Sequence, residues 1–183
     1  MRILLLLLFT LTWTTSLYAQ EAPKISTFHR LLIVNDNNEV MAVKIKNSDR
    51  WVTPGWYQDD HSSIKTGLET LADTYGLRIT TPILRGVFTL KGPKENELST
   101  RLIYVVKIKG GKLKSPDSIG EIRWLNLQQV SDIITFPHIS TQIRQILLYP
   151  GQVWGGTQIM TQESGIYGVK IVEDFYPISL NTL

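Results

Sequence analysis

The stretch GWYQDDHSSIKTGLETLADTYGL, residues 55–77, decides how the rest of the chain is interpreted. Its apolar side chains recur at spacings of four, three and four residues: Ile64, Leu68, Leu71 and Tyr75. Such spacings place side chains on one face of a helix, so the pattern predicts a helix over residues 63–75. Gly76 stands where a helix ends, because glycine adopts the left-handed conformation at low cost. The hydroxyls of Ser62 and Ser63 are candidate caps for its first turn.

Two strands are predicted on the N-terminal side of this helix. FHRLLIV, residues 28–34, and VMAVKIK, residues 40–46, are rich in branched apolar side chains. The run Asp36-Asn37-Asn38 lies between them. Asn and Asp tolerate the left-handed backbone that a tight turn requires, so the two segments form a hairpin. The segment DRWVTPGW, residues 49–56, contains a Pro-Gly pair and is predicted to be a loop.

Strands and helices continue to interleave on the C-terminal side. The patterns predict strands over residues 85–90, 101–109 and 121–125, a helix over residues 138–149, and two further strands within residues 151–183. Hairpins are too frequent for a doubly wound parallel sheet. The predicted class is therefore mixed α/β, an α/β/α sandwich with a mixed sheet between helices and a C-terminal β-hairpin.

The N-terminus predicts export from the cytoplasm. Arg2 precedes the apolar run Ile3–Phe9, and Ala19 offers a small residue for cleavage. This is the pattern of a secretory signal peptide over residues 1–19, with an uncleaved anchor as the alternative. The mature protein is expected to be periplasmic or secreted, with no stable membrane span. The chain contains no cysteine, and a domain of this length needs no disulfide to stabilise its core.

The composition argues against a nucleic-acid partner. The formal net charge is +3, and no run of Lys or Arg is longer than a pair. Nucleic-acid binding proteins concentrate basic residues in a patch or stripe. The chain also lacks a Gly-x-Ser-x-Gly elbow and a phosphate-binding glycine loop with a following lysine. Nucleophilic serine chemistry therefore has no support.

The opening stretch resembles the box of the Nudix hydrolase family, which runs G-x5-E-x7-R-E-U-x-E-E-x-G-U with U bulky and apolar. Gly55 and Gly76 have the box spacing, and Leu71 and Leu77 match the two U positions. The lead-in Trp-Val-Thr-Pro-Gly and the order of elements are also similar, over roughly residues 26–149. The resemblance implies a Nudix-like domain over residues 20–150, with residues 151–183 as an extension packed on it.

The chemistry of the box transfers poorly to this sequence. The first box glutamate falls on His61, the arginine on Glu69 and the adjacent glutamate on Thr70. The paired glutamates fall on Asp73 and Thr74. In the family those acids hold Mg²⁺, which neutralises the diphosphate and activates water. A neutral hydroxyl is a poor ligand for Mg²⁺, so the box is degenerate, and neither Mg²⁺ nor another cofactor is expected.

A displaced acid set remains the alternative. Glu69 and Asp73 are four residues apart and therefore share a helical face. Glu121 lies in the later strand, where Nudix domains often place an extra acid facing the box, and Asp59 and Asp60 precede the helix. Glu69, Asp73 and Glu121 are the candidate catalytic residues, and Glu69 and Asp73 are candidate ligands of Mg²⁺ or Mn²⁺. The competing interpretation is that both form the solvated face of an amphipathic helix.

The aromatic residues near the box are candidate ligand contacts. Trp56, Tyr57 and His61 flank the region where Nudix domains approach their substrate. A planar ring there can stack on a nucleotide-like ligand. Trp56 stands where a second glycine usually follows the Pro-Gly, so it either fills the pocket or forms its wall. Trp51 is interpreted as a core residue under the box helix.

Three functions remain open at this level. The preferred one is an exported pseudoenzyme of the Nudix fold that binds a small-molecule ligand or a partner. The alternative is an active metal-dependent hydrolase of a nucleoside diphosphate derivative or sugar diphosphate, using a non-standard acid set. The third is an envelope protein whose C-terminal hairpin mediates association. The sequence leaves the oligomeric state open.

Overall fold

The computed structural model describes residues 24–59, 61–92 and 97–179. The predicted signal peptide, residues 1–19, lies outside the described residues. No helix in the described ranges is long and apolar enough to span a membrane.

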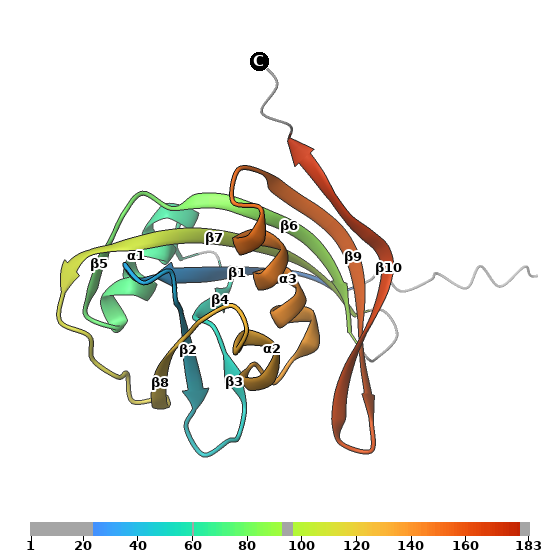
Figure 1. Ribbon diagram of the computed structural model, residues 1–183, viewed down its shortest axis with the longest axis horizontal. Coiled ribbons are helices and arrows are strands. Elements are labelled where there is room, and N and C mark those ends of the chain that lie inside the picture. The colour runs from blue at the N-terminus through green and yellow to red at the C-terminus, as the bar shows by residue number, and fades with distance from the viewer. Residues whose placement is uncertain (1–23, 60, 93–96, 180–183) are drawn as a thin grey trace, which may run out of the picture.

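One mixed sheet organises the described chain (Figure 1). Its main path runs β10-β9-β6-β7-β1-β2-β3, while β4 pairs with β1, β5 with β7 and β8 with β2. The strands are β1 (Lys24–Val34), β2 (Val40–Ile45), β3 (Trp51–Val52), β4 (Gly55–Tyr57), β5 (Leu77–Ile79), β6 (Ile83–Lys91), β7 (Glu97–Gly111), β8 (Ile119–Leu125), β9 (Val153–Glu163) and β10 (Ile166–Ser179). The helices are α1 (Ile64–Thr74), α2 (Val130–Ile133) and α3 (Pro137–Leu148).

The sheet contains both parallel and antiparallel pairs. β1 runs parallel to β7 over its whole length, and β6 runs parallel to β9. The other pairs are antiparallel. The β1–β2 turn has Asn38 at φ 60°, as the hairpin prediction requires. The prediction of a mixed sheet is therefore confirmed.

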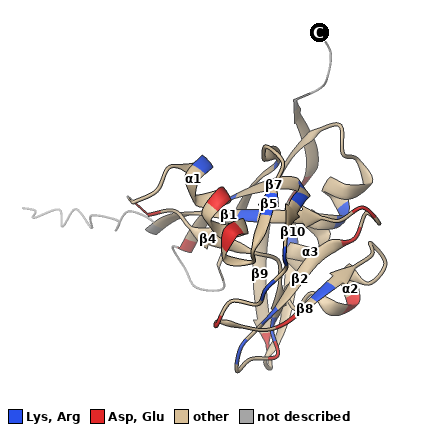
Figure 2. Ribbon diagram, turned by 90° about the vertical axis from the view of Figure 1, so that its left-hand side faces the viewer, with Lys and Arg blue, Asp and Glu red and all other residues tan. Residues whose placement is uncertain are grey.

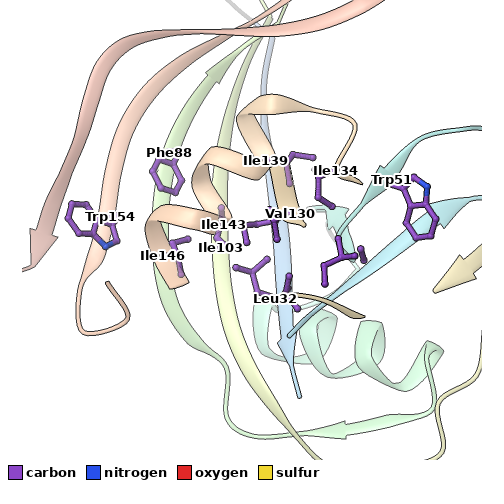
Figure 3. Close-up of a cluster of buried hydrophobic side chains, with 13 residues drawn as sticks. Leu32, Trp51, Phe88, Ile103, Val130, Ile134, Ile139, Ile143, Ile146 and Trp154 are labelled. Atoms are coloured by element: carbon purple, nitrogen blue, oxygen red, sulfur yellow. The ribbon is translucent and has the colours of Figure 1, made fainter. Parts of the chain in front are cut away.

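Alternation along β1 and β7 sends side chains into two apolar layers. Leu31 and Ile33 pack with Leu68 and Ala72 of α1 on one face. On the opposite face Leu32 and Ile103 pack against α2 and α3. Figure 3 shows the side chains of that second layer converging between α3 and the sheet: Leu32, Ile103, Ile139, Ile143 and Ile146. Helices therefore cover both faces, as predicted.

The ends of α1 follow from local chemistry. The Ser63 hydroxyl accepts a hydrogen bond from the Thr66 amide at 3.2 Å and caps the first turn. Gly76 has a φ of 72°, and its amide donates to the Asp73 carbonyl at 2.8 Å. A left-handed residue that satisfies a late helical carbonyl is the usual reason for glycine at this position. Both predicted ends of the helix are confirmed.

The C-terminal hairpin extends the sheet and is fastened to α3. β9 pairs with β6, and Trp154 is buried in the same layer as α3. The Gln142 amide donates to the Gln158 side-chain oxygen at 2.8 Å, and both residues are buried. Near the far end of the hairpin, Tyr167 meets Phe136 with ring centroids 4.6 Å apart. Figure 1 shows the hairpin standing beside α3.

Two sequence expectations need correction, and one short strand, β5, was not predicted. The loop predicted over residues 49–56 contains β3 and the start of β4, and β5 follows Gly76 directly. These strands are two or three residues long and depend on their partners, so no local pattern reveals them. Trp51 is a core residue, but it packs in the layer of α2 and α3 and not under α1. The residue beside it, Val52, contacts both layers.

Candidate functional site

The two acidic side chains of α1 lie on its exposed face. Glu69 and Asp73 border one shallow hollow of about 250 Å³ together with Arg78. Glu69 forms an ion pair with Lys65 at 3.0 Å, one turn earlier. Figure 2 shows basic and acidic segments together on this helix. The geometry is that of a solvated helical face carrying an i, i+4 pair.

The other box positions supply no carboxylate. Thr70 is exposed, and the Thr74 hydroxyl donates to the Leu71 carbonyl at 2.7 Å. That hydroxyl is engaged within the helix. No group of three or more His, Asp or Glu side chains lies close enough to hold a metal ion within the described ranges, from which Asp60 is absent. The residues described here do not fit a conventional Mg²⁺ cage.

Glu121 does not join the box acids. Its neighbours on β8, Ile122 and Trp124, pack in the layer of α1, so alternation directs Glu121 toward the opposite face. There it pairs with Arg123 at 2.6 Å, and the Arg123 guanidinium lies 4.7 Å from the centroid of the Trp51 ring. The structure therefore separates this candidate catalytic residue from Glu69 and Asp73.

Trp56 fills the space under α1. Its indole ring lies against Gly67, where an added Cβ would overlap the ring atoms. On its other side the ring stacks on His29, with centroids 4.5 Å apart and planes inclined by 22°. Of the two roles considered for Trp56, the contacts favour filling the pocket. A glycine inside the helix is required because the indole occupies the place of a side chain.

Tyr57 points the other way. It is 56% exposed and meets Phe28 edge-on, with centroids 4.9 Å apart. It borders a cleft of about 400 Å³ on the face of the sheet that α3 covers. His61 is exposed ahead of α1, and its amide donates to the Asp59 carboxylate at 3.0 Å. The three aromatic candidates therefore do not form one site.

A basic cluster on the α3 side was missed at the sequence level. Arg30 is 4% exposed, and its guanidinium donates to the hydroxyl and carbonyl of Thr53 at 2.7 and 3.2 Å. Burial, followed by the charge of Arg101, lowers the pKa of Arg30 to about 9, so it remains positive at neutral pH. The signal was available in the sequence, since Arg30 interrupts an apolar strand and charged residues are seldom fully buried.

His138 belongs to the same cluster. It is buried at the start of α3, and its Nδ1 has no hydrogen-bond partner among the described residues. Burial, and then the positive charges of Arg30 and Arg101, lower the pKa of His138 to about 3. A neutral imidazole at this position is consistent with two nearby guanidinium groups.

Solved structures identify the architecture. A MutT protein from Bacillus halodurans aligns with a TM-score of 0.61 and 16% identity, over 79% of this chain and 97% of that one. A NUDIX hydrolase from Nitrosomonas europaea aligns with a TM-score of 0.60 and 14% identity, over 78% and 81%. The chain has the Nudix fold. A UDP-X diphosphatase also aligns, with a TM-score of 0.55 and 17% identity, over 74% and 67%.

The likeness is one of structure and not of sequence. No protein-family model matches the chain, and no curated protein matches it by sequence. The structural alignments establish the Nudix fold, but at such low sequence identity they do not indicate the substrate. The sequence resemblance assigns the Nudix box to the segment that contains α1.

Replacing Gly67 by alanine tests the packing of Trp56. Gly→Ala inside a helix usually stabilises by about 1 kcal/mol. Here we expect destabilisation of about 1–3 kcal/mol, because the methyl group must displace an indole held between α1 and His29. Urea denaturation measures the change. The control is Thr70→Ala at an exposed position of the same helix, expected to be neutral or slightly stabilising. An equal gain for both variants would contradict the packing.

The buried His138 predicts a specific acid sensitivity. Its folded pKa is about 3, and its unfolded pKa is about 6.5. Between these values the unfolded chain binds a proton that the folded chain does not, so stability falls as the pH falls. From pH 7.5 to 5.0 the wild type should lose about 2 kcal/mol more than His138→Gln. Denaturation at both pH values measures the difference.

Burial also lowers the pKa of His29, so the His138→Gln variant should still lose some stability as the pH falls. The Thr70→Ala variant removes no titratable group and provides the control, whose stability should change with pH as that of the wild type does. Parallel pH curves for the wild type and His138→Gln would contradict the burial of a neutral His138.

Proposed function

We propose that the chain is an exported Nudix-fold protein that binds a small-molecule ligand and lacks standard diphosphohydrolase activity. One observation carries this proposal: of the four box glutamate positions only that of Asp73 holds an acid. The other acid of α1, Glu69, stands at the box arginine position, is exposed and pairs with Lys65. The signal-like sequence of residues 1–19 supports export.

The chemistry of diphosphate hydrolysis explains why this loss is decisive. The charged diphosphate repels an attacking water until a divalent cation neutralises its oxygens and lowers the pKa of the water. Mg²⁺ requires carboxylate ligands to be held beside the substrate. Thr70 and Thr74 offer neutral hydroxyls, and the hydroxyl of Thr74 already donates to a backbone carbonyl. We therefore propose that the protein holds no catalytic metal.

Ligand binding is supported by the preserved fold and by the cleft that Tyr57 borders. Among structures of the same fold are a MutT protein and a UDP-X diphosphatase. The second protein is named for a nucleotide derivative, and a nucleotide-like ligand is accordingly the class we propose here. A cleft of about 400 Å³ has the volume expected of a small-molecule site.

One observation favours the alternative of an active hydrolase. Glu69 and Asp73 border the same hollow, and Arg78 beside them offers a cation for an anionic substrate. A two-carboxylate site for Mg²⁺ or Mn²⁺ at this hollow would require Glu69 to leave Lys65. The competing functions therefore make opposite predictions for these two acids.

The proposed function predicts no metal-dependent turnover. The purified protein with Mg²⁺ or Mn²⁺ should release phosphate from nucleoside diphosphate derivatives and nucleotide sugars no faster than buffer, measured by a colorimetric phosphate assay with phosphatase coupling. Calorimetry with Mg²⁺ alone should give no binding heat. The matched variants are Glu69→Gln and Asp73→Asn, which should both behave as the wild type. Turnover that Asp73→Asn abolishes would establish the alternative.

A further inference from the structure

The cleft beside Tyr57 is built on one face of five strands. Its walls come from β1, β4, β6, β7 and β9, and its lining includes Ser26, Tyr57, Leu90, Ser99, Arg101 and Met160. Alternate residues of a strand face the same side of the sheet, so Ser99 and Arg101 lie on the same face as Ile103, which packs against α3. The cleft therefore opens on the face opposite α1 and its box residues.

Arg101 lines this cleft, and the buried Arg30 lies close to it without lining the cleft. The guanidinium groups of Arg101 and Arg30 lie 4.7 and 5.1 Å from the centroid of the same Phe28 ring. No described Asp or Glu forms an ion pair with either arginine. Glu97 also borders the cleft but is exposed and unpaired with them.

Part of this donor set is unused. The Nε of Arg101 is buried and makes no hydrogen bond to any described residue. The only described polar partner of its guanidinium is the Tyr57 hydroxyl at 3.5 Å, a long contact. Burying a cation without an anion is costly, and burying a donor without an acceptor adds to that cost. An anion bound here would neutralise the buried charge of Arg101 and accept a hydrogen bond from its Nε.

We propose that this cleft binds an oxyanion, the phosphate or carboxylate group of a small organic molecule, through Arg101 at the opening and Arg30 behind it. The planar guanidinium of arginine matches both groups, because each presents two oxygens to its paired N–H donors. The exposed Tyr57 ring provides an apolar surface for the rest of the molecule. Recognition requires no metal and uses no residue of α1.

This inference gives the ligand class and the binding surface of the proposed function, and it rests on that function only in taking the protein to be a binder. The two remain distinguishable, because anion binding can be measured with EDTA present. Metal-dependent turnover would defeat the proposed function and leave the cleft intact, whereas loss of anion binding would defeat only the present inference.

The test is calorimetry of the full mature chain in low-salt buffer containing EDTA. The probes are orthophosphate, pyrophosphate, uridine diphosphate and citrate, so that the phosphate and carboxylate arms are separate. At least one probe should bind with a dissociation constant below about 1 mM, and Arg101→Gln should weaken it about tenfold or more. Arg101→Lys keeps the charge and should retain part of the affinity. Failure of all four probes overturns the proposal.

The matched control is Arg78→Gln. Arg78 is exposed on β5 beside the hollow of α1, so its loss should leave the affinity unchanged. If Arg78→Gln weakens binding and Arg101→Gln does not, the anion binds at the box helix and the cleft assignment is wrong. The same comparison therefore locates the site and controls for the loss of one positive charge.

Thermal unfolding without anion separates a binding role from a structural one. Arg101 lies near a second buried cation and has no anionic partner among the described residues, so Arg101→Gln should unfold at a temperature no lower than the wild type. The stabilising shift produced by the bound probe should disappear in this variant. A lower unfolding temperature, together with an intact shift, would show that Arg101 serves the fold alone and would overturn the proposal.

Discussion

The alternation of side chains along β1 is the constraint on which the molecule depends. Leu31 and Ile33 enter the layer under α1, while Leu32 enters the layer under α3. Because β1 pairs with β7 along its whole length, the parity of one strand determines that of the other. A slip of one residue would exchange every side chain between the two layers, so this register is strongly specified.

The same parity separates the two candidate sites. On β4, Trp56 turns toward α1 and closes the space beside His29, while its neighbour Tyr57 turns toward the cleft. Arg30 and Arg101 follow the parity of Leu32 and therefore lie on the face away from the box helix. The altered residues of α1 and the cleft beside Tyr57 therefore lie on opposite faces of the sheet.

The elements that could be predicted are those whose causes are local. The apolar face of α1, its end at Gly76 and the turn at Asn38 each follow from residues close together in the sequence. The short strands β3, β4 and β5 exist only because longer strands lie beside them. The cluster at the cleft is also non-local, since the register that places Phe28 beside Arg101 joins segments far apart in the sequence. The sequence shows that Arg30 interrupts an apolar strand, but it does not show which residues of other strands lie beside Arg30.

The cost of the basic cluster is itself an argument about function. Two guanidinium groups near one Phe28 ring, without a described acid partner, reduce the stability of the folded chain. The apolar layers on both faces of the sheet, and the Gln142–Gln158 bond that fastens the hairpin, supply the stability that tolerates this cost. The hydrogen bonds of Arg30 to Thr53 and the contacts of both guanidinium groups with Phe28 offset only part of this cost. A bound anion, as proposed for the cleft, would offset the remainder.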